Sequence, residues 1–167
     1  MATLVGTQTE LVDALKELIE LEYDAIAAYT AAIDRLEEYQ FKSHFEQFRV
    51  DHQRHVRELS DTLRENGTLP PTGGDAKSLV TQGKVLIGNL AGDRGILAAM
   101  RSNEDDTNVA YERVVAHARV TSELEVMLRR NLDDERRHRR WIEDQLSTLG
   151  GSGGDIPLAS EEFVGTS

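Results

Sequence analysis

Residues 132 to 141 read Leu132-Asp-Asp-Glu-Arg-Arg-His-Arg-Arg-Trp141, and in this stretch Glu135 and His138 are three positions apart. Residues three apart lie on one face of an α-helix, so both side chains can reach the same point beside it. A matching pair, His52 and His55, stands 83 residues earlier in the chain. The repeat predicts two similar helices, each with two ligand-type side chains on one face.

A second repeat precedes each of these pairs. Glu22 is followed seven residues later by Tyr29, and Glu104 is followed seven residues later by Tyr111, with an offset of 82 residues between the copies. Each half of the chain thus offers one helix with a Glu and a next helix with two possible ligands. Four-helix bundles use this arrangement to build a two-metal site in their core.

Hydrophobic periodicity predicts four long helices. Apolar residues recur at intervals of three and four in four segments. These segments are about 8–39, 41–66, 93–119 and 121–149. Asn66-Gly67 is a typical end for the second helix, and Thr7 or Thr9 could cap the first.

The connection between the second and third long helices is too long for a hairpin turn. Pro70 and Pro71 with the glycines that follow predict a loop, and a shorter helix is expected over about 76–90. No segment shows the sustained period-two alternation of a strand. We therefore expect an all-α four-helix bundle, residues 1–149, made of two helical hairpins joined by a long crossover that contains a short helix. Residues 150–167 begin with a Gly/Ser-rich stretch and are expected to form a flexible linker and tail.

The candidate ligands fall on the apolar stripes of the predicted helices. Burying an unpaired carboxylate is costly, and a cation that neutralises the carboxylates is the simplest compensation. Each residue taken alone could instead be a satisfied core or rim group, and residues 135–138 could form a salt-bridged surface face. The repetition in both halves of the chain favours the metal site.

Tyr29 and Tyr111 lie two helical turns from Glu22 and Glu104, on the same side of their helices. As functional residues, they would donate hydrogen bonds to the metal ligands or act as redox-active phenols. Alternatively, they fill the core and their hydroxyls find a neighbour. Both interpretations remain open from the sequence.

Composition excludes several classes of function. The chain has 167 residues, no Cys and a formal net charge of −11, so thiolate sites are excluded and the basic footprint of a nucleic-acid-binding protein is missing. An acidic surface raises the local concentration of cations, although it also serves plain solubility. There is no apolar run of membrane-spanning length and no signal-peptide pattern, so we expect no membrane partner and a cytoplasmic location.

These residues resemble the ferritin-like superfamily, which includes ferritin, bacterioferritin and rubrerythrin. Its pattern is a Glu on the first and third helices and Glu-x-x-His on the second and fourth. The residues that match it are Glu22, Glu104 and the pair Glu135-x-x-His138. The resemblance covers about residues 8–149 and implies a di-metal centre with Glu135 as a bridging ligand.

The second helix departs from the family pattern. His52 occupies the place of the family's Glu, and the missing carboxylate could come from Asp51. His52 would then be a ligand, a neighbour of a ligand or a bystander. If Asp51 stays outside, the site has three carboxylates and three His, and zinc, manganese or a single occupied position become alternatives to two iron ions.

The resemblance implies a non-haem di-iron protein that binds Fe(II) and oxidises it with O2 or peroxide, for iron sequestration or protection from oxidative stress. A ferroxidase of this type is expected to be a homo-oligomer, a dimer or larger. The alternative is a non-enzymatic bundle with a structural metal or none, acting as an interaction module. In addition, the tail from Asp155 to Gly165 resembles the C-terminal peptides that load ferritin-like cargo into encapsulin shells; a disordered tail without this role is the alternative.

Overall fold

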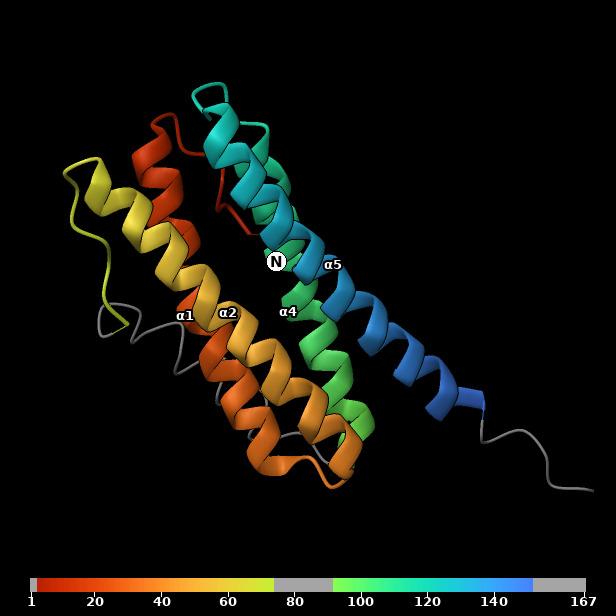
Figure 1. Ribbon diagram of the computed structural model, residues 1–167. Coiled ribbons are helices and arrows are strands. Elements are labelled where there is room, and N and C mark those ends of the chain that lie inside the picture. Colours follow the sequence, from red (N-terminus) through yellow and green to blue (C-terminus); the bar gives the residue numbers. More distant parts are fainter. Residues whose placement is uncertain (1–2, 74–91, 152–167) are drawn as a thin grey trace, which may run out of the picture.

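The computed structural model describes residues 3–73 and 92–151. Four long α-helices account for most of these residues, and no strand occurs among them (Figure 1). The helices are α1 (Leu11–Arg35), α2 (Tyr39–Glu65), α4 (Gly92–Val115) and α5 (Ser122–Gly151). The predicted all-α bundle is confirmed. The short helix expected over 76–90 and the tail beyond Gly151 lie outside the described residues.

The directions of the helices require a crossover between the two hairpins. Helices α1 and α2 pack against each other as one antiparallel pair, and α4 and α5 as the other (Figure 1). At the start of α4, Asp93 contacts the turn between α1 and α2. Beyond the end of α4, His117 Nε2 lies 3.2 Å from the carbonyl oxygen of Thr9, next to the start of α1. Helices α2 and α4 therefore run in the same direction, and the chain between them must pass from one end of the bundle to the other.

The turn between α1 and α2 is formed by a contact from the other hairpin. Helix α1 ends at Arg35, whereas the sequence pattern predicted a helix to about Tyr39. The backbone N–H groups of Glu37 and Glu38 donate to the two carboxylate oxygens of Asp93, at 2.8 and 2.9 Å. A continuing helix would direct these N–H groups to its own carbonyls, so the contact with α4 replaces the last predicted turn.

The remaining helix ends follow local chemistry in part. Helix α2 ends where Asn66-Gly67 predicted: Gly67 has a φ of 71°, and the N–H of Thr68 donates to the carbonyl of Leu63 at 2.9 Å, as in a Schellman motif. At the start of α5, the Thr121 hydroxyl accepts a hydrogen bond from the N–H of Leu124. By contrast, α4 ends at Val115, before the predicted end near residue 119.

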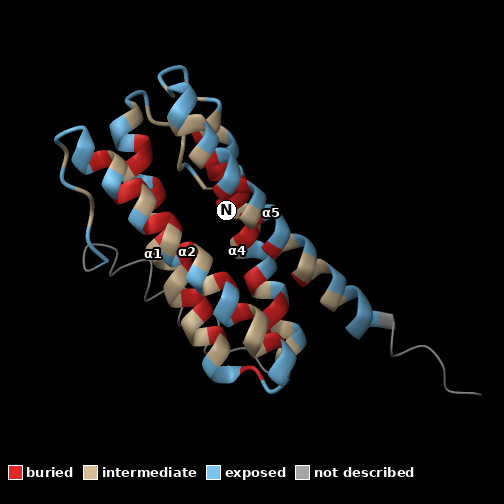
Figure 2. Cartoon of the chain, in the orientation of Figure 1, coloured by how far each residue is buried: buried red, intermediate tan, exposed pale blue. Residues whose placement is uncertain are grey.

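The core consists of two apolar clusters, one in each half of the bundle. One lies towards the start of α1 and contains Leu18, Leu59 and Leu128; the other lies towards the end of α1 and contains Phe45 and Met100, among other residues. Buried residues follow the inward faces of the helices (Figure 2). On each helix, the buried Glu and His residues that the sequence analysis selected lie between these two clusters. Among the described residues, no helix has the length and apolar character that a membrane span requires.

Candidate metal centre

Six polar side chains form a layer between the two apolar clusters. Each of the four helices contributes to it, and each of these residues is fully buried. They are Glu22, His52, His55, Glu104, Glu135 and His138. Their positions in mid-helix follow from the heptad-like stripes, which place all six on the inward faces of their helices.

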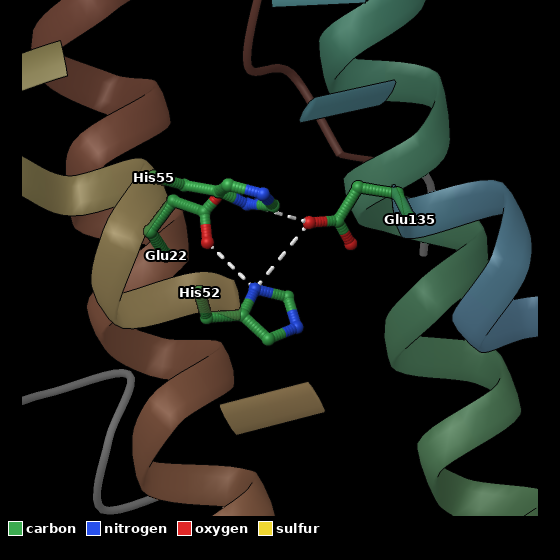
Figure 3. A group of neighbouring side chains, drawn as sticks. All are labelled: Glu22, His52, His55 and Glu135. Atoms are coloured by element: carbon green, nitrogen blue, oxygen red, sulfur yellow. Dashed lines mark hydrogen bonds and ion pairs between the residues drawn. The ribbon is translucent and has the colours of Figure 1, made fainter. Parts of the chain in front are cut away.

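The first group of possible ligands consists of Glu22, His52, His55 and Glu135 (Figure 3). His52 Nδ1 lies 2.6 Å from Glu22 Oε2, and His55 Nδ1 lies 3.1 Å from Glu22 Oε1. Glu135 reaches across from α5, with its Oε1 at 3.1 Å from His55 Nδ1 and 3.4 Å from His52 Nδ1. Two carboxylates and two imidazoles thus converge on one point between α1, α2 and α5.

The second group consists of His52, Glu104, Glu135 and His138. His52 Nε2 lies 3.6 Å from Glu104 Oε1, and His138 Nδ1 lies 3.9 Å from Glu104 Oε2. His52 and Glu135 belong to both groups, so the two points of convergence are neighbours. In each group the possible ligand atoms lie within 4.8 Å of one another, which is close enough for one ion to contact all of them.

The hydrogen bonding of this layer is incomplete without a cation. Four buried atoms have no hydrogen-bond partner among the described residues: both carboxylate oxygens of Glu135, His52 Nε2 and His138 Nδ1. Glu135 Oε1 is near two imidazoles, but these contacts are not aligned as hydrogen bonds. Buried polar atoms are nearly always satisfied in folded proteins. Carboxylate oxygens and imidazole nitrogens are ligands that bind Fe, Mn and Zn. The residues present therefore fit a metal ion.

Electrostatics in the layer favour positive charge. Burial alone would raise the pKa of Glu22, but His55 and His52 lower it below its usual range. Burial raises the pKa of Glu135; His52 counteracts this effect, and Glu104 and Glu22 increase it again. Conversely, burial lowers the pKa of His55, yet the Glu22 carboxylate and other neighbours raise it to about 11. Without metal, protonated imidazoles provide the positive charge that the carboxylates require.

The two tyrosines connect the hairpins through the same carboxylates. The hydroxyl of Tyr111 on α4 donates to Glu22 Oε1 on α1 at 2.5 Å, and the hydroxyl of Tyr29 on α1 donates to Glu104 Oε1 on α4. Each phenol therefore bonds to the Glu of the opposite hairpin rather than to the one two turns away on its own helix. Burial and the adjacent carboxylate raise the pKa of both phenols well above the usual value, so they stay protonated donors.

A ring of four charged side chains covers the layer between α2 and α5. Arg137 contacts Asp51 at 2.8 Å and Asp134 at 2.7 Å, and Arg54 pairs with both of these aspartates as well. The aspartates also face the outer nitrogens of the histidines. Asp51 Oδ2 lies 3.1 Å from His138 Nε2, and Asp134 Oδ2 lies 3.4 Å from His55 Nε2, which also lies 3.1 Å from Arg54.

Asp51 therefore lies on the outer side of the His138 ring, outside both groups of possible ligands. Of the residues that sequence analysis selected, His52 and not Asp51 is the member of α2 that joins His55 in the buried layer. The sequence analysis missed Asp134, Arg54 and Arg137. The signal was present, because the offset of 83 residues that relates His55 to His138 also relates Asp51 to Asp134 and Arg54 to Arg137.

Comparison with protein families finds one match, over residues 10–117, to a domain of unknown function, DUF2383. The match covers more than half of the chain. The protein belongs to the DUF2383 family. No curated protein and no solved structure matches the chain.

The DUF2383 match includes only part of the candidate metal centre. Residues 10–117 include α1, α2 and α4, and with them four of the six buried polar residues of the layer. Helix α5, which carries Glu135 and His138, follows the matched region. In this DUF2383 protein, the buried Glu and His groups could hold a metal ion, and the family description adds no function to that statement.

Proposed function

We propose that this DUF2383 protein is a di-iron protein that binds Fe(II) and oxidises it with O2 or peroxide, in iron sequestration or protection from oxidative stress. One observation carries the proposal: two overlapping groups of buried Glu and His side chains meet at Glu135, whose two oxygens have no hydrogen-bond partner. A buried carboxylate in that position is costly unless a cation compensates it.

The roles of the ligands follow from the two groups. Glu22 and His55 would hold one ion, and Glu104 and His138 would hold the other. Glu135 belongs to both groups and would be the bridging ligand that the two ions share. Asp51, which the sequence offered as an alternative ligand, would hold the His138 ring in place from outside.

The proposed reaction transfers electrons from the substrate Fe(II) to the oxidant. Two Fe(II) ions each lose one electron. When the oxidant is O2, it takes both electrons and two protons to give hydrogen peroxide. When the oxidant is hydrogen peroxide, it takes both electrons and two protons to give two water molecules. The contribution of this chain is to hold the ions side by side, to exclude water from the fully buried layer and to keep Tyr29 and Tyr111 bonded to Glu104 and Glu22. Each phenol thereby fixes the orientation of one carboxylate.

The architecture supports this proposal through its resemblance to ferritin-like proteins. The single crossover between parallel α2 and α4, and the Glu and His residues in mid-helix, are features that di-metal bundles share. The ligand set of three carboxylates and three imidazoles also suits manganese or zinc. Metal content after loading therefore decides between these ions.

The competing function is a bundle with a structural metal or none that serves as an interaction module. Two observations favour a reactive site over this alternative: the layer combines unpartnered ligand atoms with two phenols bonded to the carboxylates. A structural site would bind metal and consume no oxygen. A metal-free interaction module would bind no metal.

The first experiment measures metal stoichiometry. Protein loaded anaerobically with Fe(II) and then desalted should retain close to two irons per chain, and a Glu135→Ala, His138→Ala double variant should retain less than one. The matched control is Glu143→Ala on the same helix, which removes a partly exposed carboxylate and should retain two irons. On exposure to air, only the loaded wild type and this control should consume oxygen rapidly. If the wild type retains no iron, the proposal is wrong. If it retains iron but consumes no oxygen, the structural-metal alternative remains.

A further inference from the structure

We propose that His52 binds both ions of this site, with Nδ1 to one and Nε2 to the other, so that an imidazole ring bridges them beside the Glu135 carboxylate. The inference rests on the metal site of the proposed function and specifies its ligands further. It assigns His52 a role that the residue types alone left open.

The first nitrogen of His52 faces the first ligand group. His52 Nδ1 lies 2.6 Å from Glu22 Oε2 and 3.4 Å from Glu135 Oε1. Figure 3 shows this nitrogen between the two carboxylates, while the other nitrogen of the His52 ring points away from the other three residues drawn. A metal ion held by Glu22, His55 and Glu135 would therefore also meet His52 Nδ1.

The second nitrogen faces the second ligand group. His52 Nε2 lies 3.6 Å from Glu104 Oε1, beyond a hydrogen bond, and it has no hydrogen-bond partner although the side chain is fully buried. His138 Nδ1, which lies near the other carboxylate oxygen of Glu104, is also buried and has no hydrogen-bond partner among the described residues. Two unpartnered imidazole nitrogens beside one carboxylate are what an ion held by Glu104 and His138 would require.

The other two histidines of the layer differ from His52 in this respect. His55 and His138 each turn Nδ1 inward and Nε2 towards an aspartate of the outer ring, Asp134 or Asp51. Each can therefore offer Nδ1 to a metal and keep an N–H on Nε2. For His138 this N–H donates to Asp51. For His55 it faces Asp134, and Arg54 lies beside it. Of these three rings, only that of His52 has a cluster carboxylate near each nitrogen.

Charge balance favours the bridge over a ring that binds through one nitrogen. Glu22, Glu104 and Glu135 carry three negative charges, and two divalent ions carry four positive ones. A ring that binds through both nitrogens has no N–H; its proton passes to water, and the ring contributes the fourth negative charge. The buried layer is then neutral, which avoids the cost of an uncompensated charge away from water.

The test counts exchangeable imidazole N–H groups in protein loaded with Co(II) alone. A ring bound through one nitrogen keeps one N–H, which gives a paramagnetically shifted proton resonance that disappears in D2O. We expect two such resonances in the wild type, from His55 and His138, together with shifted C–H resonances from all three rings. A His55→Gln variant should lower the count from two to one.

A His52→Glu variant replaces the proposed bridge with a carboxylate. It should keep both exchangeable resonances and lose only the C–H resonances of the His52 ring. If the wild type instead shows three exchangeable resonances, one of them lost in His52→Glu, His52 binds through one nitrogen and the bridge is overturned with the metal site intact. Shifted C–H resonances that are unchanged in His52→Glu would show that His52 is not a ligand. No shifted resonance in the wild type would overturn the proposed metal site as well. Should His52→Glu fail to fold, the wild type still decides: two exchangeable resonances with shifted C–H resonances from three rings support the bridge, whereas three exchangeable resonances, or C–H resonances from two rings only, overturn it.

Discussion

Tyr29 and Tyr111 each connect the two hairpins by a hydrogen bond to a carboxylate of the buried layer. Each packs as an apolar ring in the core and donates its hydroxyl proton to a Glu of the opposite hairpin. A hydrogen bond to a buried carboxylate contributes more than one between neutral groups. Each tyrosine is therefore part of the core and also bonds to a carboxylate that we propose as a metal ligand.

The Tyr29→Phe variant should be less stable than wild type without metal. The ring would keep its edge contact with Phe45, at 5.0 Å between centroids, but Glu104 would lose a buried donor. We expect the free energy of unfolding to fall by about 2 kcal/mol, measured by urea denaturation in the presence of a chelator. Tyr39→Phe is the matched control, because the Tyr39 side chain is 80% exposed; equal losses in both variants would contradict the role of the buried hydroxyl.

At the scale of elements, α2 and α5 are linked by the ring of Asp51, Arg54, Asp134 and Arg137. These two helices pack less closely against each other than the helices within each hairpin do. The ring therefore supplies polar contacts where apolar packing is thin, directly outside two of the proposed ligands. Groups that hold a metal-binding imidazole from outside commonly affect metal affinity strongly.

The Asp51→Ala variant should bind metal about 10- to 100-fold more weakly than wild type. The reason is that His138 Nε2 loses the acceptor that fixes its ring. Affinity would be measured by competition with a chelator of known strength. Asp51→Asn keeps an acceptor oxygen and should recover most of the affinity. The control, Asp61→Ala, removes an exposed ion pair on the same helix; if Asp51→Ala weakened binding no more than this control, the positioning role would be wrong.

At the scale of the whole molecule, the buried layer weakens the metal-free bundle and would strengthen the loaded one. A polar layer divides the apolar core into two clusters, and Glu135 contributes to it a carboxylate that has no hydrogen bond among the described residues. A metal that binds only the folded state stabilises it in proportion to RT ln(1 + [L]/Kd). We therefore expect stability and metal binding to be coupled through this layer.

The Glu135→Gln variant should separate these two effects. Glu135 has no hydrogen bond among the described residues, and burial together with Glu104 and Glu22 raises its pKa. These effects oppose its ion pairs with His52 and His55, so we expect the variant to be about as stable as wild type in urea denaturation with a chelator present. With Fe(II) or Co(II) added, the denaturation midpoint of the wild type should rise and that of the variant should not. A variant that is clearly less stable without metal would show that Glu135 already has effective partners in the metal-free fold.

Much of the fold and of the site could be predicted because both depend on periodicity within each helix. Stripes at intervals of three and four identified four helices, and the same stripes contained Glu22, Glu104 and Glu135, all of which are fully buried. The ends of α1 and α4 could not be predicted in this way. The turn after Arg35 depends on Asp93, more than fifty residues away in the chain, and local propensity contains no information about such a contact.

The amino-acid sequence by itself determined which side chains face the centre of this bundle, since the rotation per residue in a helix fixes which positions share a face. Only the tertiary structure decided how those side chains meet. It placed Asp51 outside the ligand groups, directed each tyrosine to the opposite hairpin and set the two nitrogens of His52 towards different carboxylates. These outcomes depend on the relative position and rotation of helices that are distant in the chain, and packing between hairpins fixes both.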